Sequence, residues 1–376
     1  MKLKPKILIL TDWFVPGYKA GGPIQSLNNM VESLQHEIDF HVLTGDRDLL
    51  ESVPYSGVEF DQWMKVDSHS RMYTTAKSRQ ALILEALKND TYQGVYLNSF
   101  FSIDFSIKPL LALRRMNRLN KVILAPRGML GAGALKIKGL KKGLFIWLFN
   151  RLNIGSSIRI HSTDKSESSD ILKAIGKVAI REISNLPAQI KPHRKTAKSP
   201  IPKFLFASRV SPKKNLKLAM EHLNASGEML ELNVFGQEDD VEYARMCRSY
   251  LMPNATLEFH GAVPPKSLKS AYLNHDFFIL PTMNENFGHA IIEALAYGLP
   301  VIISDQCPWG DVESFGAGWV IPLKDTERWK ECIREAAILR DVDYVKMSER
   351  AQQYVHDKIN FDDIRSHYLN LFRETS

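Results

Sequence analysis

The chain has 376 residues, of which 44% are hydrophobic and 24% are charged. This length predicts two domains, and the apolar content excludes a disordered chain. No apolar run approaches the ~20 residues of a membrane-spanning helix, and the apolar run near the N-terminus stops at Asp12 without a small-residue cleavage site. Three widely spaced cysteines suit neither a disulfide framework nor a zinc site, which favours a reducing, cytoplasmic location.

The formal net charge of +7 is unevenly distributed. Residues 1–200 contain 30 Lys and Arg against 17 Asp and Glu, which gives +13, whereas residues 201–376 contain 19 against 25, which gives −6. This asymmetry predicts two differently specialised halves. The first half would face something anionic, such as a nucleic acid, a lipid surface or a charged acceptor molecule.

The first half alternates short apolar runs with amphipathic stretches. Apolar strands separated by helices predict a parallel sheet that is covered on both faces. The predicted strands are 6–10, 38–43, 94–98 and 121–125, and the predicted helices are 23–34, 76–88 and 106–118.

The same alternation restarts after 185–202, a polar, basic and Pro-interrupted stretch. We therefore expect an α/β fold of two Rossmann-like doubly wound domains that face a central cleft. The expected parts are a domain at 1–187, a linker at 188–202, a domain at 203–356, and a C-terminal helix within 357–376 that packs back toward the first domain. The predicted strands of the second domain are 203–208, 230–236, 256–261, 276–281 and 300–304, alternating with helices.

The sequence ENFGHAIIE, 285–293, follows a predicted strand and opens a predicted helix. Backbone N–H groups at such a helix start, together with the helix dipole, favour phosphate or sugar oxygens. Glu285 lies at this start, and Glu293 can lie on the same edge and accept the two hydroxyls of a ribose. An ordinary helix start with acidic residues is the alternative. The N–H groups concerned belong to Asn286, Phe287 and Gly288.

Arg209 and Lys214 flank a tight Ser-Pro turn after the strand 203–208. Two cations that converge on one strand end repel each other unless an anion lies between them. Arg can clamp a phosphate bidentately while Lys adds a point charge. We predict an anion-binding pair here, with two solvated loop residues as the alternative.

Gly21 and Gly22 precede a predicted helix that starts at Pro23. Glycines at this point let the backbone approach a ligand closely, and the helix start offers donors to a phosphate. A plain turn is the alternative for so short a motif.

Together, these motifs resemble glycosyltransferase family 4, the retaining nucleotide-sugar-dependent enzymes of the GT-B fold. The Glu-x7-Glu pattern, the Arg/Lys pair before it and the glycine loop after the first strand carry the resemblance, which covers most of the chain. The matching stretches are GYKAGGPIQSL near the N-terminus, the Arg/Lys pair, HGAVPPKSLKSAY at 260–272 and NENFGHAIIEALAYGLPVIISD at 284–305.

The resemblance implies three catalytic residues, Arg209, Lys214 and Glu285. The two cations would bind the donor diphosphate and neutralise the leaving group, while Glu285 would hold the hydroxyls of the donor sugar. Glu293 would take the ribose, and the base would lie near Ala262 and Val263. The implied donor-binding residues are Gly21, Gly22, Val263, Asn286, Phe287, Gly288 and Glu293.

In one respect the chain departs from the family. Members often place a histidine of the first domain near the transferred sugar, and none of the 11 histidines lies at the corresponding stretches, 96–102 and 125–130. We predict Asn98 and Arg127 as sugar or acceptor contacts instead. The alternative is that both are strand-end residues that satisfy loop backbone.

Asp46 and Asp48 form an Asp-x-Asp pattern, the metal–diphosphate signature of the other large glycosyltransferase fold. We predict no metal site there, because Arg209 and Lys214 already supply the positive charge that a metal would provide. His289, inside the Glu-x7-Glu helix, is predicted to pack rather than to act as a base.

The segment 135–152 contains five basic residues and no acidic one, interleaved with Phe and Trp. It can lie on an anionic membrane as an interfacial helix. A basic-faced helix packed on its own domain is the interpretation that we favour over membrane contact, and nucleic-acid binding is disfavoured because no recognition module appears.

We predict a metal-independent, cofactor-free glycosyltransferase that moves a sugar from a nucleoside-diphosphate-sugar donor to a hydroxyl acceptor with retention of configuration. A saccharide or lipid-linked acceptor, and a place in cell-surface polysaccharide or glycolipid assembly, fit the basic first half. The expected location is the cytoplasm, with contact to the inner face of the membrane. A nucleotide-sugar 2-epimerase of similar fold and a non-catalytic nucleotide-binding scaffold are the alternatives.

Overall fold

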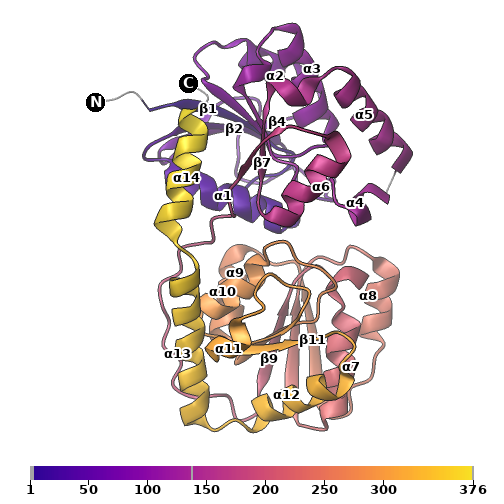
Figure 1. Cartoon of the computed structure of the whole chain (residues 1–376). Helices are drawn as coiled ribbons and strands as arrows, with labels where there is room; N and C mark the ends of the chain where they lie inside the picture. Colours follow the sequence, from indigo (N-terminus) through magenta and orange to yellow (C-terminus); the bar gives the residue numbers. More distant parts are fainter. Residues whose placement is uncertain (1–3, 137–138, 375–376) are drawn as a thin grey trace. The chain divides into compact units, whose positions relative to one another are not determined.

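The computed structural model describes residues 4–136 and 139–374. The chain divides into two compact α/β units (Figure 1). Unit 1 comprises Met1–Leu186 and Phe361–Ser376, and unit 2 comprises Pro187–Asn360. The division lies next to the predicted boundary at residue 187, and the helix at the C-terminus belongs to unit 1.

Unit 1 is built on one sheet. Its strands are β1 (Lys6–Leu10), β2 (Asp39–Gly45), β3 (Met64–Val66), β4 (His69–Thr74), β5 (Gly94–Leu97), β6 (Val122–Leu124), β7 (Arg159–Ser162) and β8 (Ala179–Glu182). Within the described residues the order is β3-β4-β2-β1-β5-β6-β7-β8. Neighbouring strands are parallel, except that β3 runs antiparallel to β4 at one edge.

The helices of unit 1 cover both faces of this sheet. They are α1 (Gly22–Leu34), α2 (Arg79–Lys88), α3 (Lys108–Arg115), α4 (Ala132–Lys136), α5 (Gly139–Arg151), α6 (Lys165–Ile175) and α14 (Phe361–Arg373). Shorter helical turns are η1 (Ile103–Ile107), η2 (Leu119–Lys121) and η3 (Ile154–Ser157). Side chains alternate along a strand, so Ile7 and Ile9 of β1 pack with α1 and α14, while Leu8 and Leu10 pack on the other face with α2, α3, α5 and α6.

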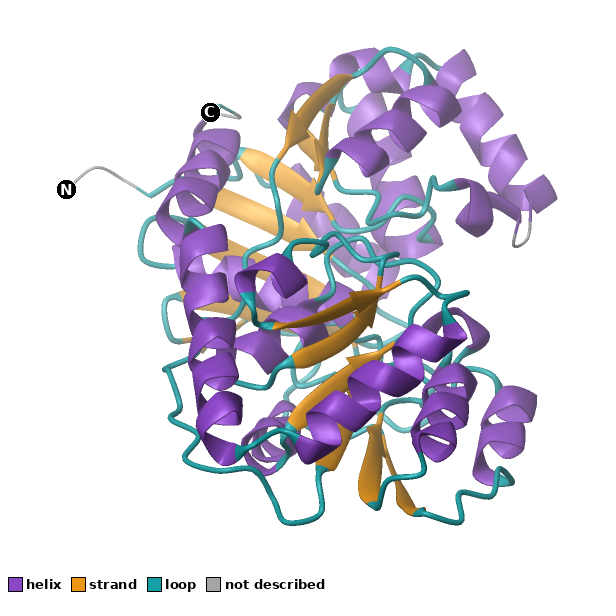
Figure 2. Cartoon of the chain, turned by 60° about the horizontal axis from the view of Figure 1, so that its bottom comes forward, coloured by secondary structure: helices purple, strands orange, loops and turns teal. Residues whose placement is uncertain are grey.

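Unit 2 repeats the plan with a fully parallel sheet (Figure 2). Its strands are β9 (Lys203–Ala207), β10 (Leu230–Phe235), β11 (Ala255–Gly261), β12 (Phe277–Leu280), β13 (Val301–Ser304) and β14 (Gly318–Ile321), in the order β11-β10-β9-β12-β13-β14. Its helices are η4 (Pro212–Lys214), α7 (Leu216–Ser226), α8 (Val241–Arg248), α9 (Pro265–Asn274), α10 (His289–Ala296), α11 (Val312–Phe315), α12 (Thr326–Ile338) and α13 (Asp341–Lys358).

The predicted pair of parallel-sheet α/β domains is confirmed, with corrections at both edges of the sheet in unit 1 and at one edge of the sheet in unit 2. The antiparallel strand β3 and its neighbour β4 were not expected, and neither were β7 and β8 at the opposite edge or β14 in unit 2. Strands β4, β7 and β8 read HSRMYT, RIHS and AIRE, so they lack the continuous apolar run that marks a buried parallel strand.

The segment 188–202, predicted as a linker, is fastened along unit 2. The ammonium of Lys195 is buried and donates hydrogen bonds to the carbonyl oxygens of Leu273 (2.7 Å) and His275 (2.8 Å) at the end of α9. A helix end leaves such carbonyls without partners inside the helix. The N–H of Ser199 also donates to the carboxylate of Asp276 at 3.1 Å. The polar composition of the segment did not indicate these anchors.

Candidate functional site

The start of α10 in unit 2 is shaped by Gly288. This residue has φ +77°, and a Cβ on it would lie 3.2 Å from Cγ of Glu285 and 3.0 Å from Cδ1 of Ile291. Glycine is therefore required both by the backbone angle and by the neighbouring side chains. Across the described ranges, the backbone N–H groups of residues 286–288 have no hydrogen-bond acceptor. The loop thus offers three free donors at a helix start, as the sequence predicts.

The carbonyl oxygen of Phe287 in this loop is held by Trp309, a residue that we did not select from the sequence. Nε1 of Trp309 donates to the carbonyl oxygen of Phe287 at 2.5 Å, and the two rings meet edge to face with centroids 5.5 Å apart. The ring of His289 also lies against Phe287, at 4.7 Å between centroids. His289 therefore has the packing contact that we expected of it.

Lys214 and Glu285 form a buried ion pair. The ammonium of Lys214 donates to both oxygens of Glu285, at 2.9 Å for Oε2, and the side chains are only 10% and 13% exposed. The carbonyl of Lys213 binds the two loops together by accepting from the N–H of Met283 (2.8 Å) and the hydroxyl of Thr282 (3.2 Å). The structure thus brings two of the three predicted catalytic side chains into contact.

Arg209 lies on the same loop but turns to a different partner. Its guanidinium bonds to the carboxylate of Asp239 at 2.8 Å and remains about half exposed. Burial lowers the pKa of Lys213, and the charge of Lys214 lowers it further, with a smaller contribution from Arg209. Three positive groups therefore gather after β9, although Arg209 does not touch Lys214 or Glu285.

Glu293 is buried inside α10 and faces aromatic residues. Burial raises the pKa of Tyr272 well above its ordinary value, and the charge of Glu293 and a hydrogen bond to it raise it further. The Tyr272 ring stacks on Tyr297 with centroids 5.3 Å apart. Val263, predicted near the base, follows β11 and is half-buried. The ribose and base contacts stay predictions.

In unit 1 the glycine loop is held by Asp48. Its carboxylate accepts hydrogen bonds from the backbone N–H groups of Tyr18 (2.7 Å) and Lys19 (3.0 Å), just before Gly21. Gly21 has φ +67°, and the space in front of its Cα is open. Glycine suits this angle, and the loop backbone is accessible there.

The same contacts explain the Asp-x-Asp pattern. Asp48 is used by the glycine loop, and Asp46 is bound by the guanidinium of Arg47 through two hydrogen bonds of 3.0 and 2.8 Å. The hydrogen bond from Arg47 is the largest influence that lowers the pKa of Asp46. Both carboxylates thus have structural partners, and Asp48 positions a loop that we predicted for ligand binding.

Asn98 and Arg127 meet at the carboxyl edge of unit 1. Asn98 follows β5 and Arg127 follows β6, its neighbour in the sheet. Nε of Arg127 donates to Oδ1 of Asn98 at 2.8 Å, and the other nitrogens donate to Asn185 (2.8 Å) and the hydroxyl of Tyr96 (2.9 Å). Asn98 and Arg127, chosen separately from the sequence, belong to one network.

Asp12 is a residue at this edge that the sequence analysis did not select. It follows β1, the strand beside β5, and accepts a hydrogen bond from the hydroxyl of Ser102 at 2.8 Å. Burial raises its pKa. A carboxylate directly after the first apolar strand was a usable signal, because ligands of parallel sheets bind at the carboxyl ends of the strands.

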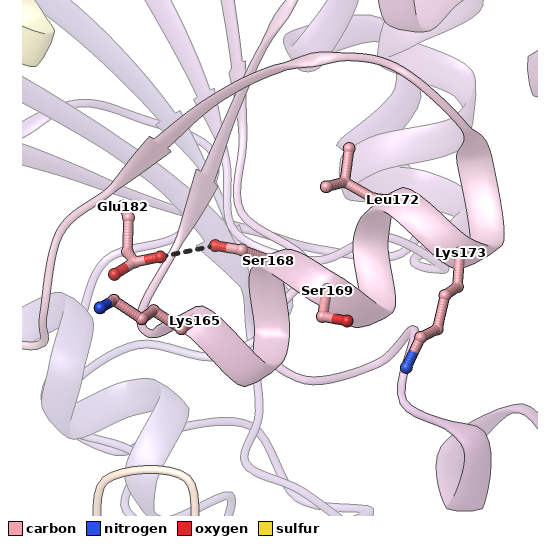
Figure 3. A pocket seen from close by; sticks show the side chains of 6 residues that line it. All are labelled: Lys165, Ser168, Ser169, Leu172, Lys173 and Glu182. Carbon is pink, nitrogen blue, oxygen red and sulfur yellow. Dashed lines mark hydrogen bonds between the residues drawn. The ribbon is translucent and has the colours of Figure 1, made fainter.

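A pocket of about 450 Å³ lies between α6 and β8 in unit 1 (Figure 3). Ser168 donates to Glu182 at 2.9 Å inside it, and Figure 3 shows the side chains of Lys165 and Lys173 at opposite ends. No predicted site residue lines it, and its cations do not converge. We therefore do not assign the substrate to this pocket.

Helix α5 exposes an apolar stripe, here called the α5 stripe: Leu140 (94% exposed), Leu144 (67%) and Trp147 (61%). These positions share one face of the helix, while Phe145 and Phe149 are buried in unit 1. In the part of the chain that the structure describes, no helix combines the length and the apolar character needed to cross a membrane. Ile137 and Lys138 of the predicted segment lie outside the described residues.

Comparison with known proteins relates the chain to glycosyltransferases. Residues 189–354 match the family model of glycosyl transferases group 1, a range that contains the predicted residues of unit 2. An uncharacterized 41.2 kDa protein in the cps region of Klebsiella pneumoniae is 21% identical over 94% of this chain and 96% of its own length. A probable sucrose-phosphate synthase of Thermosipho melanesiensis is 31% identical over 48% of this chain and 42% of its own length.

The solved structure of Anabaena Alr3699/HepE in complex with UDP and glucose covers 98% of this chain and 99% of its own, with a TM-score of 0.72 at 15% identity. At this identity the likeness concerns the fold. The whole chain therefore has the two-domain GT-B fold of glycosyltransferases, and its second unit carries the match to group 1 of these enzymes.

Proposed function

We propose that this protein is a retaining glycosyltransferase that moves a sugar from a nucleoside-diphosphate-sugar donor to a hydroxyl group of an acceptor. The observation that carries the proposal is the contact of Lys214 with Glu285 beside the free N–H groups of residues 286–288. In one place these groups supply a cation and donors for a diphosphate, and a carboxylate for sugar hydroxyls. The group 1 match over residues 189–354 supports the proposal.

The chemistry needs charge stabilisation at the leaving group. When the bond from the anomeric carbon to the β-phosphate oxygen breaks, negative charge grows on the diphosphate and the sugar becomes oxocarbenium-like. The Lys214 ammonium and the free N–H groups favour this state over the ground state, because the charge on the phosphate is larger there. In a front-face transfer the leaving phosphate oxygen takes the proton of the acceptor, so the anomeric configuration is retained without a protein base.

We propose that the transferred sugar is a hexose. We also propose that the transfer needs no metal, since the loop after β9 contains three cations that can neutralise the diphosphate, Arg209, Lys213 and Lys214. Arg209 would leave Asp239 to bind the diphosphate. The donor contacts of the remaining predicted residues, Gly21, Gly22, Val263 and Glu293, belong to this proposal.

The comparisons favour a UDP-sugar as donor, because HepE binds UDP and glucose in its crystal structure. The relative from a cps region supports a role in cell-surface polysaccharide or glycolipid assembly. The acceptor would then be a saccharide or a lipid-linked glycan.

Incubation with UDP-, GDP- and ADP-sugars tests this function. We expect release of the nucleoside diphosphate from one donor, slowly to water and faster to an added acceptor, in the presence of EDTA. Proton NMR of the product would show the anomeric configuration of the donor. Formation of an epimer would instead indicate a 2-epimerase, and binding without turnover would indicate a scaffold.

We further propose that the protein works on the inner face of an anionic membrane, held by the α5 stripe. Lys141 and Arg151 of the same helix are exposed beside it, and the stretch between Asp104 and Asp164 contains no acidic residue. Apolar side chains inserted at the headgroup level and cations around them favour an anionic lipid surface.

Sedimentation with lipid vesicles tests the membrane proposal. We expect the protein to bind vesicles that contain phosphatidylglycerol and to bind pure phosphatidylcholine vesicles less. The double variant Leu144→Gln, Trp147→Gln should lose binding, whereas Leu172→Gln, which changes an exposed leucine on α6, should not. Equal binding by both variants would contradict the proposal.

A further inference from the structure

Arg127 lies in a turn that does not suit an arginine. It has φ +55° and is followed by Gly128 with φ +73°, and the N–H of Met129 donates to the carbonyl of Pro126 at 3.2 Å. Two successive residues with positive φ are a turn geometry that favours Gly, Asn and Asp. The position of the guanidinium, rather than the turn, therefore accounts for an arginine here.

The guanidinium is held in one orientation by neutral groups. Its three hydrogen bonds go to the amide oxygens of Asn98 and Asn185 and to the hydroxyl of Tyr96. Asn98, Asn185 and Tyr96 are buried, so they form a fixed frame. The hydroxyl of Tyr368 lies near enough to accept from a fourth of the five N–H groups.

The carbonyl oxygen of Ile183 determines which nitrogen of His161 carries the proton, and this in turn determines the direction of the hydrogen bond from Tyr96. Nε2 of His161 lies 3.0 Å from the carbonyl oxygen of Ile183, which can only accept, so Nε2 carries the proton. Nδ1 then accepts from the Tyr96 hydroxyl at 2.7 Å, and the Tyr96 oxygen accepts from Arg127. Burial lowers the pKa of His161 to about 3, and the charge of Arg127 contributes, so the ring is neutral. The network therefore brings no negative charge to Arg127.

Among the described residues, the direct hydrogen-bond partners of the Arg127 guanidinium are neutral, and none is a carboxylate. The charge of Glu167 acts on Arg127 from a distance, while its oxygens accept from the N–H of Gly128 (2.5 Å) and from the N–H (2.8 Å) and hydroxyl (2.7 Å) of Thr163. Glu167 thus holds the turn that carries Arg127 and attracts the guanidinium without touching it. Because no carboxylate touches the half-buried guanidinium, an anionic group of a ligand would supply the direct charge contact that the protein does not.

We propose that Arg127 binds an anionic group of the acceptor, so that the acceptor is a phosphate- or carboxylate-bearing saccharide and not a neutral one. This inference rests on the proposed function and names the acceptor class. Arg127 lies at the carboxyl edge of the sheet, beside Asn98 and near Asp12 on the adjoining strands. The amide and carboxylate groups there can form hydrogen bonds with sugar hydroxyls, while the guanidinium binds the phosphate or carboxylate of the acceptor.

Matched acceptors test the inference on the unaltered protein. One pair is octyl glucoside and octyl glucuronide, which differ in a carboxylate on the sugar. The other pair is a monosaccharide linked to a short prenyl chain through a diphosphate and the same sugar linked to a neutral alkyl chain. We expect at least one anionic member to have a kcat/KM about tenfold or more above its neutral partner. The pair that shows the preference identifies the sugar or the lipid linkage as the source of the charge.

The variants Arg127→Gln and Arg127→Lys then assign the preference to this residue. We expect Arg127→Gln to reduce the anionic-to-neutral ratio to about one, and Arg127→Lys, which keeps the charge without the planar fork, to retain part of it. Arg115→Gln, on the exposed surface of α3, is the matched control and should keep the wild-type ratio. Thermal unfolding shows whether each variant is folded. If a variant does not fold, the ratio measured on the wild-type protein still tests the acceptor preference.

The outcomes separate the two proposals. If the donor is consumed and neutral acceptors serve as well as anionic ones, the inference about Arg127 is wrong while the glycosyltransferase function stands. If a preference exists but Arg127→Gln retains it, another residue binds the anion. If no donor is turned over with any acceptor or with water, the proposed function fails, and the inference fails with it.

Discussion

The two cations that we assign to substrates, Lys214 in unit 2 and Arg127 in unit 1, are held in opposite ways. Lys214 is buried against the carboxylate of Glu285, so its charge is already balanced in the ligand-free protein. Arg127 bonds to neutral oxygens, and no carboxylate is in direct contact with it. An anion at Lys214 therefore competes with an internal carboxylate, whereas an anion at Arg127 has no such competitor. The first arrangement suits a group that must be released after reaction, and the second suits steady recognition.

The largest expected effect is on turnover. Lys214→Ala should lower kcat by about a hundred- to a thousandfold, or roughly 3–4 kcal/mol of barrier, because it removes a fixed donor from the leaving group. Released nucleoside diphosphate measures the rate. Lys217→Ala, which changes a partly exposed lysine on α7, should retain the wild-type rate. Activity within about threefold of wild type would mean that Lys214 does not contact the leaving group.

The variant Glu285→Gln tests whether the charge of Lys214 is balanced by an internal carboxylate. It leaves the ammonium of Lys214 buried without its counter-charge, so the free energy of unfolding should fall by about 3 kcal/mol. UDP should then raise the melting temperature more than it does in the wild type, since Lys214 no longer has an internal competitor. Asp239→Asn, which frees the exposed Arg209, should change stability by less than about 1 kcal/mol. Equal stabilisation of wild type and Glu285→Gln by UDP would contradict the competition between Glu285 and the ligand for Lys214.

The network behind Arg127 predicts a pH dependence. The pKa of His161 is about 3 in the folded protein, below the ordinary value of 6.5, so the unfolded chain binds the extra proton more readily. The contribution of His161 to the free energy of unfolding should therefore be fully present above pH 6.5. It should fall as the pH drops toward 3, by up to about 1.4 kcal/mol per pH unit. Chemical denaturation between pH 7 and pH 4 measures the slope. His161→Gln should make the slope less steep, although His69 and other buried histidines still contribute, and His367→Gln, at an exposed position, should leave it unchanged.

The smallest expected effect concerns the α5 stripe. Because Leu144 and Trp147 are exposed, replacing both with Gln should change the free energy of unfolding by only about 0.5 kcal/mol or less. Urea denaturation measures this value on the same variant that is used with vesicles. A large loss of stability would mean that the stripe is part of the packing of unit 1 and would remove its membrane role.

The sequence indicated the fold well for the apolar strands in the middle of each sheet and less well at the sheet edges, where even the apolar strand β14 was missed. The runs that became β1, β5, β9 and β12 are buried in the middle of their sheets, so their composition alone marked them. The polar strands β4, β7 and β8 left no such mark. Their place in the sheet depends on neighbours that are far away in the chain.

For the candidate site, the sequence supplied the chemistry of single residues but not their pairing. Lys214 follows β9 and Glu285 follows β12, about seventy positions later. They touch because β9 and β12 are neighbours in the sheet. Asn98 and Arg127 meet for the same reason after β5 and β6, and their partner Asn185 lies in a stretch that reads as a linker.

By itself the sequence determined the local features of this protein: apolar strands, a helix start at Gly288, and cations and carboxylates placed just after strands. These features depend on neighbours within a few residues, so composition and spacing reveal them. The tertiary structure alone decided that Lys214 touches a carboxylate and that Arg127 touches only neutral groups. Strand order and the packing of distant segments fix which charges meet, and burial then makes each meeting, or its absence, energetically important.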